Sequence, residues 1–222
     1  MSSMPTIRVF QDLSVIAVDK DAPALRDKLI ATARKPWFHD PEAESRIVGA
    51  KLLPGEGMVA FRRERDLDAE AALVTLWPNG AGGYKVTNIV PREANSLSEQ
   101  QYNVILRDFA ETVVKAAAPD SSIELSPDHE GPLDWTSQSA ANALWEFCAS
   151  ANKATGASHP SDRQSWMHFL VMQHETGHGR LTPSRLAQWL VKADKWPEDV
   201  ANDLAIEYES AIELLDYYDG HK

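Results

Sequence analysis

Residues 70–90, EAALVTLWPNGAGGYKVTNIV, set the class of the fold. Residues 70–77 form an apolar run that includes Val, Thr and Trp, which favour strands. Residues 84–90 place alternate side chains on opposite faces, as a strand does. Between them, residues 78–83 (PNGAGG) contain three glycines, which adopt positive φ without strain and favour a tight turn. The stretch therefore predicts two antiparallel strands, with one face of the sheet covered.

Further strands and two helices are predicted around this hairpin. Residues 57–65 (GMVAFRRER) predict a third strand of the meander, and TIRVF and SVIAV predict short strands near the N-terminus. A helix is expected over residues 21–35, where Asp21 serves as the N-cap. Another helix is expected from Ser96 to about Ala118, because Ser96 followed by Glu99 fits a capping box. These helices are expected to cover the sheet.

Residues 119–132, PDSSIELSPDHEGP, mark the clearest boundary in the chain. They are polar, contain three prolines, and separate a mixed region from one that reads as helical throughout. We therefore expect an α+β protein in which an antiparallel sheet with covering helices precedes a four-helix C-terminal unit. The expected parts are an α+β domain at 1–120, a linker or edge strand at 121–132, and a helical domain at 133–222.

Composition excludes several classes of protein. The chain has 222 residues and a net charge of −11, which disfavours binding to nucleic acid. No run of eighteen apolar residues is present, so no membrane span is expected, and the N-terminus does not resemble a secretory signal. Cys148 is the single cysteine and is expected in the core. A cytoplasmic location is expected.

The segment His174-Glu175-Thr176-Gly177-His178 has the H-E-x-x-H pattern. On a helix, the i, i+4 spacing lets both imidazoles bind one Zn²⁺ while Glu175 polarises the metal-bound water. The pattern resembles the zincin family of zinc proteases. That resemblance implies a third ligand from a glutamate on a later helix, here Glu207 or Glu209.

A helix terminus is the competing interpretation of this segment. Gly177 and Gly179 bracket His178, and a glycine after an apolar helix commonly ends it. If the helix ends at Gly177, the i, i+4 geometry is lost. We favour this interpretation, which assigns no catalytic residue and no cofactor. The alternative is a zinc hydrolase with Glu175 as general base and His174, His178 and Glu207 as ligands.

The C-terminal region concentrates negative charge. Residues 194–219 contain nine acidic residues and one basic residue, Lys195, a local charge of −8. Glu209, Glu213 and Asp216 follow i, i+4, i+7 spacing and would form one acidic stripe on a helix. The alternative is that this acidic face is only solvated and binds no partner.

This stripe predicts a non-enzymatic, acidic protein that binds a protein partner. The partner is expected to be basic. The protein would then act like an antitoxin or an immunity protein that inhibits a basic partner, an analogy that rests on charge and not on a sequence motif. Neither nucleic acid nor a membrane is expected as a partner. Homo-oligomerisation is left open.

Overall fold

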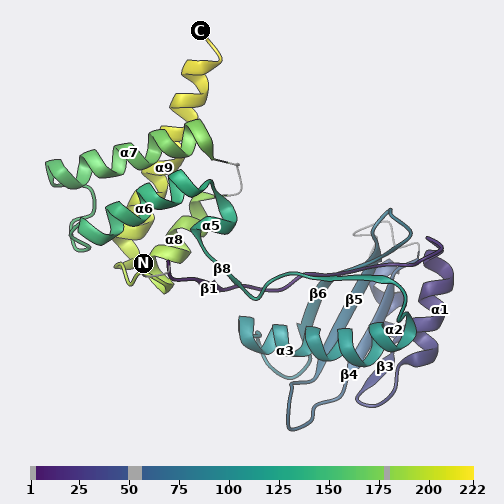
Figure 1. Cartoon of the computed structure of the whole chain (residues 1–222). Coiled ribbons are helices and arrows are strands. Elements are labelled where there is room, and N and C mark those ends of the chain that lie inside the picture. The colour runs from purple at the N-terminus through teal and green to yellow at the C-terminus, as the bar shows by residue number, and fades with distance from the viewer. Residues whose placement is uncertain (1–3, 50–56, 178–180) are drawn as a thin grey trace. The chain divides into compact units, whose positions relative to one another are not determined.

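The computed structural model describes residues 4–49, 57–177 and 181–222. It is an α+β protein that combines an antiparallel sheet with helices, as the sequence predicted. The chain divides into two compact units (Figure 1). The sheet unit comprises Val9–Asp128, and the helical unit comprises Met1–Arg8 with His129–Lys222.

The sheet unit is built on six antiparallel strands in the order β3-β4-β5-β6-β2-β7. The three strands of the predicted meander are present, and every end lies within two residues of the expected one. The strands are β2 (Leu13–Ile16), β3 (Trp37–His39), β4 (Val59–Arg63), β5 (Ala72–Pro78), β6 (Gly83–Pro91) and β7 (Ser122–Leu125).

The turn between β5 and β6 explains the glycine-rich sequence. The Asn79 side-chain oxygen accepts hydrogen bonds from the backbone of Ala81 (3.0 Å) and Gly83 (3.1 Å). Gly82 has φ +82°, and a Cβ at this position would lie 2.5 Å from Lys20. Only glycine therefore fits, which fixes the register of the hairpin.

Helices cover both faces of the sheet. Leu25, Leu29 and Phe109 belong to the main core, which lies beneath α1 (Ala22–Thr32) and α3 (Glu99–Phe109). On the opposite face, α2 (Pro41–Gly49) packs Ala43 against Met58 and Ala60. The helix α3 continues through a π-helical turn, η1 (Ala110–Val114), into α4 (Lys115–Ala117).

The start of α3 differs from the prediction. Its N-cap is Ser98, whose hydroxyl accepts from the Gln101 backbone, while the Gln101 side chain accepts from the Ser98 backbone. The capping box thus uses a pair two residues later than Ser96 and Glu99. Glutamine at the third helical position serves this motif as well as glutamate does.

In its described residues, the helical unit contains the four predicted helices and a short additional one. The bounds are α5 (Pro132–Trp135), α6 (Gln138–Ser150), α7 (Pro160–Thr176), α8 (Pro183–Lys192) and α9 (Glu198–Asp219). None of the helices in the described ranges combines the length and apolar character that a membrane span needs.

The N-terminal segment belongs to the helical unit, whereas the sequence predicts one domain over residues 1–120. Strand β1 (Ile7–Arg8) pairs antiparallel with β8 (His129–Glu130). The Trp189 indole N–H also donates to the Pro5 carbonyl oxygen at 2.8 Å. The chain therefore leaves the helical unit after Arg8 and returns to it at His129.

Candidate functional site

The helix that carries the HETGH segment ends inside the motif. Helix α7 ends at Thr176, and Gly177 is its C-cap with extended backbone (φ −67°, ψ 157°). The Gly177 N–H donates to the Gln173 carbonyl oxygen at 2.8 Å. His178 lies outside the described residues. The helical backbone on which the i, i+4 spacing of the zinc interpretation depends thus ends at Thr176.

Contacts made by the motif residues account for this helix end. A Cβ at Gly177 would lie 2.2 Å from the Gln173 carbonyl oxygen, so the chain requires glycine there. The Thr176 hydroxyl lies 2.7 Å from the Ser137 hydroxyl and 3.0 Å from that of Ser139. Ser137 is itself the N-cap of α6. Thr176 therefore joins the end of α7 to the start of α6, and Gly177 allows the chain to pass close to Gln173.

His174 faces two carboxylates of α9. Its Nε2 lies 3.3 Å from Asp216 Oδ1 and 3.5 Å from Asp219 Oδ2. The pKa of Asp219 is lowered, first by the hydrogen bond from Lys222 and then by the charges of Lys222 and His174. Glu175, the next residue, is exposed.

The proposed third zinc ligand, Glu207, is engaged elsewhere. It forms an ion pair with Arg163 near the start of α7. Arg163 is eleven residues before His174, which is about 16 Å along a helix. Among the residues that the structure describes, no group of three or more His, Cys, Asp or Glu side chains is placed to hold a metal ion.

A groove of about 360 Å³ lies between the end of α7, the start of α8 and α9. One wall carries Glu209, Glu213 and Asp216, the three residues predicted to bind a partner, and all three are exposed. Apolar and polar side chains complete the lining. They are Gln173, Leu181, Thr182, Pro183, Tyr208 and Ile212, together with His174 and the backbone of Gly177.

Buried polar groups form the inner part of this groove. The Tyr208 hydroxyl donates to the Leu181 carbonyl oxygen at 3.0 Å, and the Gln173 side chain accepts from Thr136. Burial, followed by the negative charge of Asp216, raises the pKa of Tyr208 to about 12. The hydroxyl therefore stays neutral and acts as a fixed donor at ordinary pH.

The groove wall is strongly acidic and has little compensating charge. Helix α9 contains eight acidic residues and neither lysine nor arginine. Within the described parts of the chain, Glu209 and Glu213 make no ion pair, whereas Asp216 faces His174. Two of the three predicted residues therefore have no cationic partner among the described residues.

The second half of α9 is less buried than its periodicity predicted. Helical spacing in the sequence predicts that Ala211, Ile212 and Leu215 continue the core stripe of Leu204 and Tyr208, but these three side chains are only half-buried. The buried residues of the helix end at Tyr208. The C-terminal end of α9 extends past the other helices of its unit (Figure 1).

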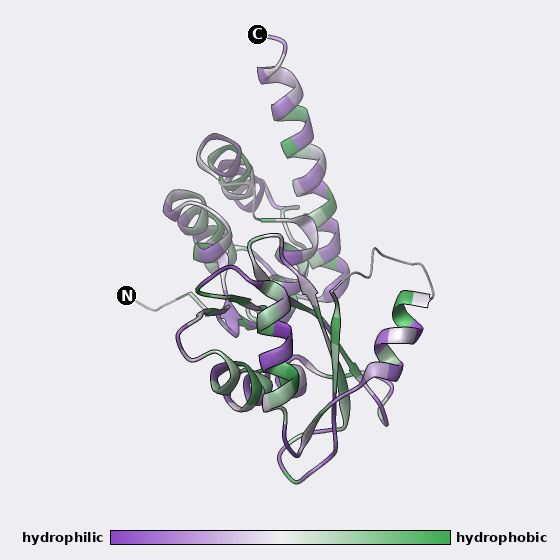
Figure 2. Cartoon of the chain, turned by 90° about the vertical axis from the view of Figure 1, so that its right-hand side faces the viewer, coloured by the Kyte–Doolittle hydropathy of each residue, from purple (hydrophilic) through white to green (hydrophobic). Residues whose placement is uncertain are grey.

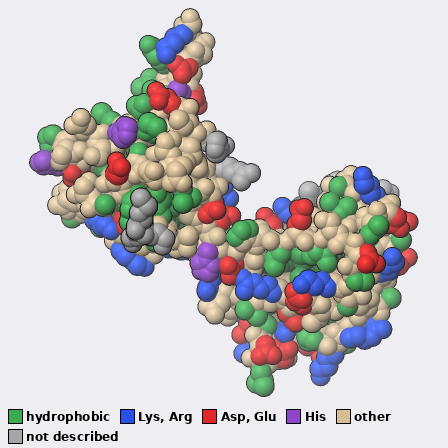
Figure 3. Space-filling model, viewed as in Figure 1, with side chains coloured by type: hydrophobic (Ala, Val, Ile, Leu, Met, Phe, Trp, Pro, Cys, Tyr) green, Lys and Arg blue, Asp and Glu red, His purple; other side chains and the backbone are tan. Residues whose placement is uncertain are grey.

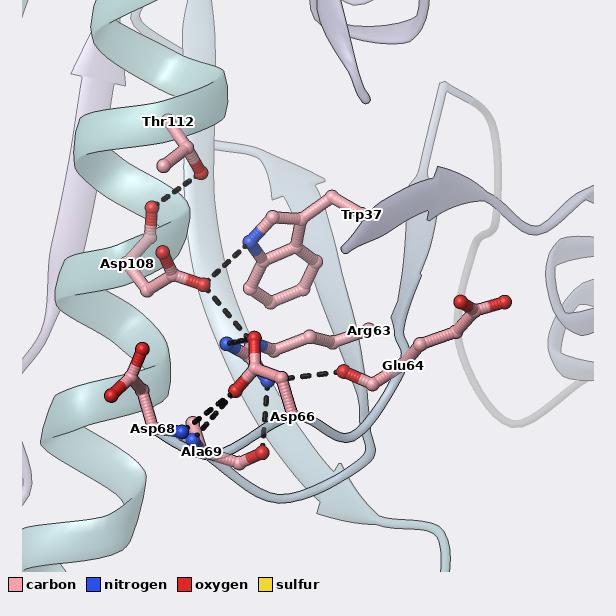
Figure 4. A network of polar contacts seen from close by, with 8 residues as sticks. All are labelled: Trp37, Arg63, Glu64, Asp66, Asp68, Ala69, Asp108 and Thr112. Carbon is pink, nitrogen blue, oxygen red and sulfur yellow. Dashed lines mark hydrogen bonds and ion pairs between the residues drawn. The ribbon is translucent and has the colours of Figure 1, made fainter. Parts of the chain in front are cut away.

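A polar cluster in the sheet unit has a structural role. The Arg63 side chain, 2% exposed, donates to Asp108 Oδ2 (2.9 Å), Asp66 Oδ2 (2.8 Å) and two backbone carbonyls. Asp108 Oδ2 also accepts from the Trp37 indole at 2.9 Å (Figure 4). The guanidinium is engaged on all three nitrogens, so the cluster ties α3 to β3 and the β4–β5 loop and offers no cation to a ligand.

The acidic groove is therefore the candidate functional site of this protein. It brings together predicted residues from α9 with apolar side chains that the sequence analysis did not assign to a site. The exposed, half-apolar end of α9 was also missed, because periodicity alone does not reveal which helical faces remain uncovered.

Comparison with protein-family models, curated proteins and solved structures finds no match to this chain.

Proposed function

We propose that this protein is a non-enzymatic binding protein that holds a basic segment of a protein partner in the groove beside α9. One observation carries the proposal: Glu209, Glu213 and Asp216 are exposed together on one wall of a groove that also has an apolar lining. A lysine- or arginine-rich segment would gain both charge complementarity and apolar contact there. Inhibition of a basic partner, in the manner of an antitoxin or immunity protein, is one role that such binding serves.

The arrangement of these acids is unfavourable for the isolated helix. Glu209 and Glu213 are like charges at i, i+4, which destabilises a helix by about 0.2–0.5 kcal/mol. Acids in the last turns, such as Asp216 and Asp219, also interact unfavourably with the helix dipole. A bound cationic segment would relieve both effects. This cost to the helix indicates that the acidic surface does more than keep the protein in solution.

Titration with a lysine-rich peptide over a range of salt concentrations tests the proposal. Neutralising the wall with Glu209→Gln, Glu213→Gln and Asp216→Asn should weaken binding by about tenfold and flatten its salt dependence. The matched control removes three exposed acids of the sheet unit, with Glu64→Gln, Asp68→Asn and Glu124→Gln. Equal weakening by both triple variants would mean that only net charge matters and would contradict a site at the groove.

A further inference from the structure

Large apolar side chains are exposed on the helix that carries the acidic wall. Ile206, Leu214 and Tyr217 are 61%, 66% and 65% exposed. Their spacing of i, i+8 and i+11 places them on one side of α9, next to Glu213. Figure 2 shows hydrophobic and hydrophilic residues mixed along this helix, and Figure 3 shows both kinds of side chain on its projecting end.

Ile206, Leu214 and Tyr217 stay mostly exposed among the described residues, and the contact that the structure shows there is the Tyr217 ring stacked on His221, at a centroid distance of 4.0 Å. The end of α9 extends beyond the other helices of the unit, and Tyr218 is a further apolar side chain there, at 60% exposure. Contiguous exposed apolar surface rimmed by charge is typical of a protein interaction site. The outer face of α9 thus adds an apolar surface to the acidic groove wall.

Charge decides which occupant fits this face. A second copy of α9 would bring eight acids against eight acids, and like charges across a helix pair oppose association. Anionic membrane surfaces and nucleic acids are repelled for the same reason. A helix with an apolar face flanked by Lys and Arg complements both features of α9.

We infer that the partner segment is a basic amphipathic helix that lies along α9, an inference that rests on the proposed function. Its apolar side contacts Ile206, Leu214 and Tyr217, and its cations lie beside Glu209 and Glu213. These residues span eleven positions, about 16 Å or three turns. The partner helix therefore needs at least three turns, with apolar residues at i, i+3, i+4 and i+7 spacing.

Two synthetic peptides of identical Leu and Lys composition test this inference. In one, the leucines follow i, i+3, i+4, i+7 spacing; in the other, they are spread around the helix. The amphipathic peptide should bind the full chain at least about tenfold more tightly and gain helical circular dichroism on binding. Equal binding of both peptides, with loss in the acidic-wall variant, would overturn the helix inference and leave the proposed function standing.

A pair of variants separates the apolar contacts from charge. Leu214→Ser with Tyr217→Ser should weaken the amphipathic peptide by about tenfold while the salt dependence stays unchanged. The control, Met167→Ser with Val171→Ser, changes two exposed apolar residues of α7, at 49% and 42% exposure. Equal loss in both variants would overturn the inference, and so would a concentration-dependent dimer that Leu214→Ser with Tyr217→Ser abolishes. If neither peptide binds, the proposed function fails as well.

Discussion

Gly177 packs directly against Gln173. A Cβ added at Gly177 would lie 2.2 Å from the Gln173 carbonyl oxygen and 2.3 Å from the Gln173 side-chain Nε2. Both atoms of Gln173 are held in place, the oxygen by the helix and the buried side chain by Thr136. The glycine within the HETGH segment is therefore explained by close packing at the end of α7. This gives the motif a structural role that does not involve a metal.

Replacing Gly177 with alanine should lower the free energy of unfolding by about 1–3 kcal/mol, because the added Cβ forces the helix end to shift. Urea unfolding of the full chain measures this change. The matched control is Gly220→Ala, also at a helix end, where the new Cβ would lie 3.4 Å from the nearest atom. That variant should stay within about 0.5 kcal/mol of the parent. Equal effects at the two positions would argue against close packing as the constraint.

The Arg63 cluster predicts a second large loss of stability. Asp108→Ala removes an ion-pair partner of buried Arg63 and the acceptor of the buried Trp37 indole. We expect a loss of about 3 kcal/mol, because a buried charge and a buried donor each lose a partner. Glu111→Ala, which breaks an exposed pair with Lys115 on the following helical turn, should cost less than about 0.5 kcal/mol. A similar small effect for both variants in urea unfolding would show that the cluster is not stabilising.

Local sequence patterns predicted which residues form strands, but not the contacts between distant parts of the chain. The strands around 57–90 follow from alternation and from a turn in which Gly80 and Gly82 have positive φ, and both signals are local. The pairing of Ile7 with Glu130 joins distant parts of the sequence, so the place of the N-terminal segment was not predicted. The bond between Thr176 and Ser137, which ties the end of α7 to another helix, is likewise long-range.

The acidic stripe shows what helical periodicity does and does not determine. Spacing alone placed Glu209, Glu213 and Asp216 on one face, and the structure brings them to one groove wall. The same periodicity assigned Ile212 and Leu215 to the core, where they are only half-buried. Periodicity identifies the apolar face of a helix, but the depth of burial depends on which neighbours reach it.

The raised pKa of Tyr208 predicts a loss of stability at alkaline pH. Its pKa rises from 10.0 to about 12, so the folded state favours the neutral phenol. The stabilisation is complete below about pH 10 and is lost as the pH rises through about 12, with a magnitude on the order of 2 kcal/mol.

Tyr208→Phe tests this dependence. The variant lacks the hydrogen bond to Leu181 and should be about 1 kcal/mol less stable than the parent at neutral pH. Because phenylalanine does not ionise, that difference should shrink or reverse between about pH 10 and pH 12. Urea unfolding at a series of pH values measures it. A difference that stays constant with pH would show that Tyr208 is not the titrating group.

Metal content separates partner binding from the zinc hydrolase alternative. Helix α7 ends at Thr176, His174 faces Asp216 and Asp219, and Glu207 pairs with Arg163. We therefore expect the untagged chain to contain well below one zinc per molecule by mass spectrometry. A chelator should leave both its unfolding and its peptide binding unchanged.

The variant His174→Ala with His178→Ala should then have the same metal content as the parent. The matched control is His159→Ala with His168→Ala, which changes two exposed histidines of the same region. Near one zinc per chain, lost from the first variant and retained in the control, would instead establish a metal site at the HETGH segment. In that case Glu175→Gln should leave the metal bound and abolish hydrolysis, because a general base acts on the metal-bound water without holding the ion.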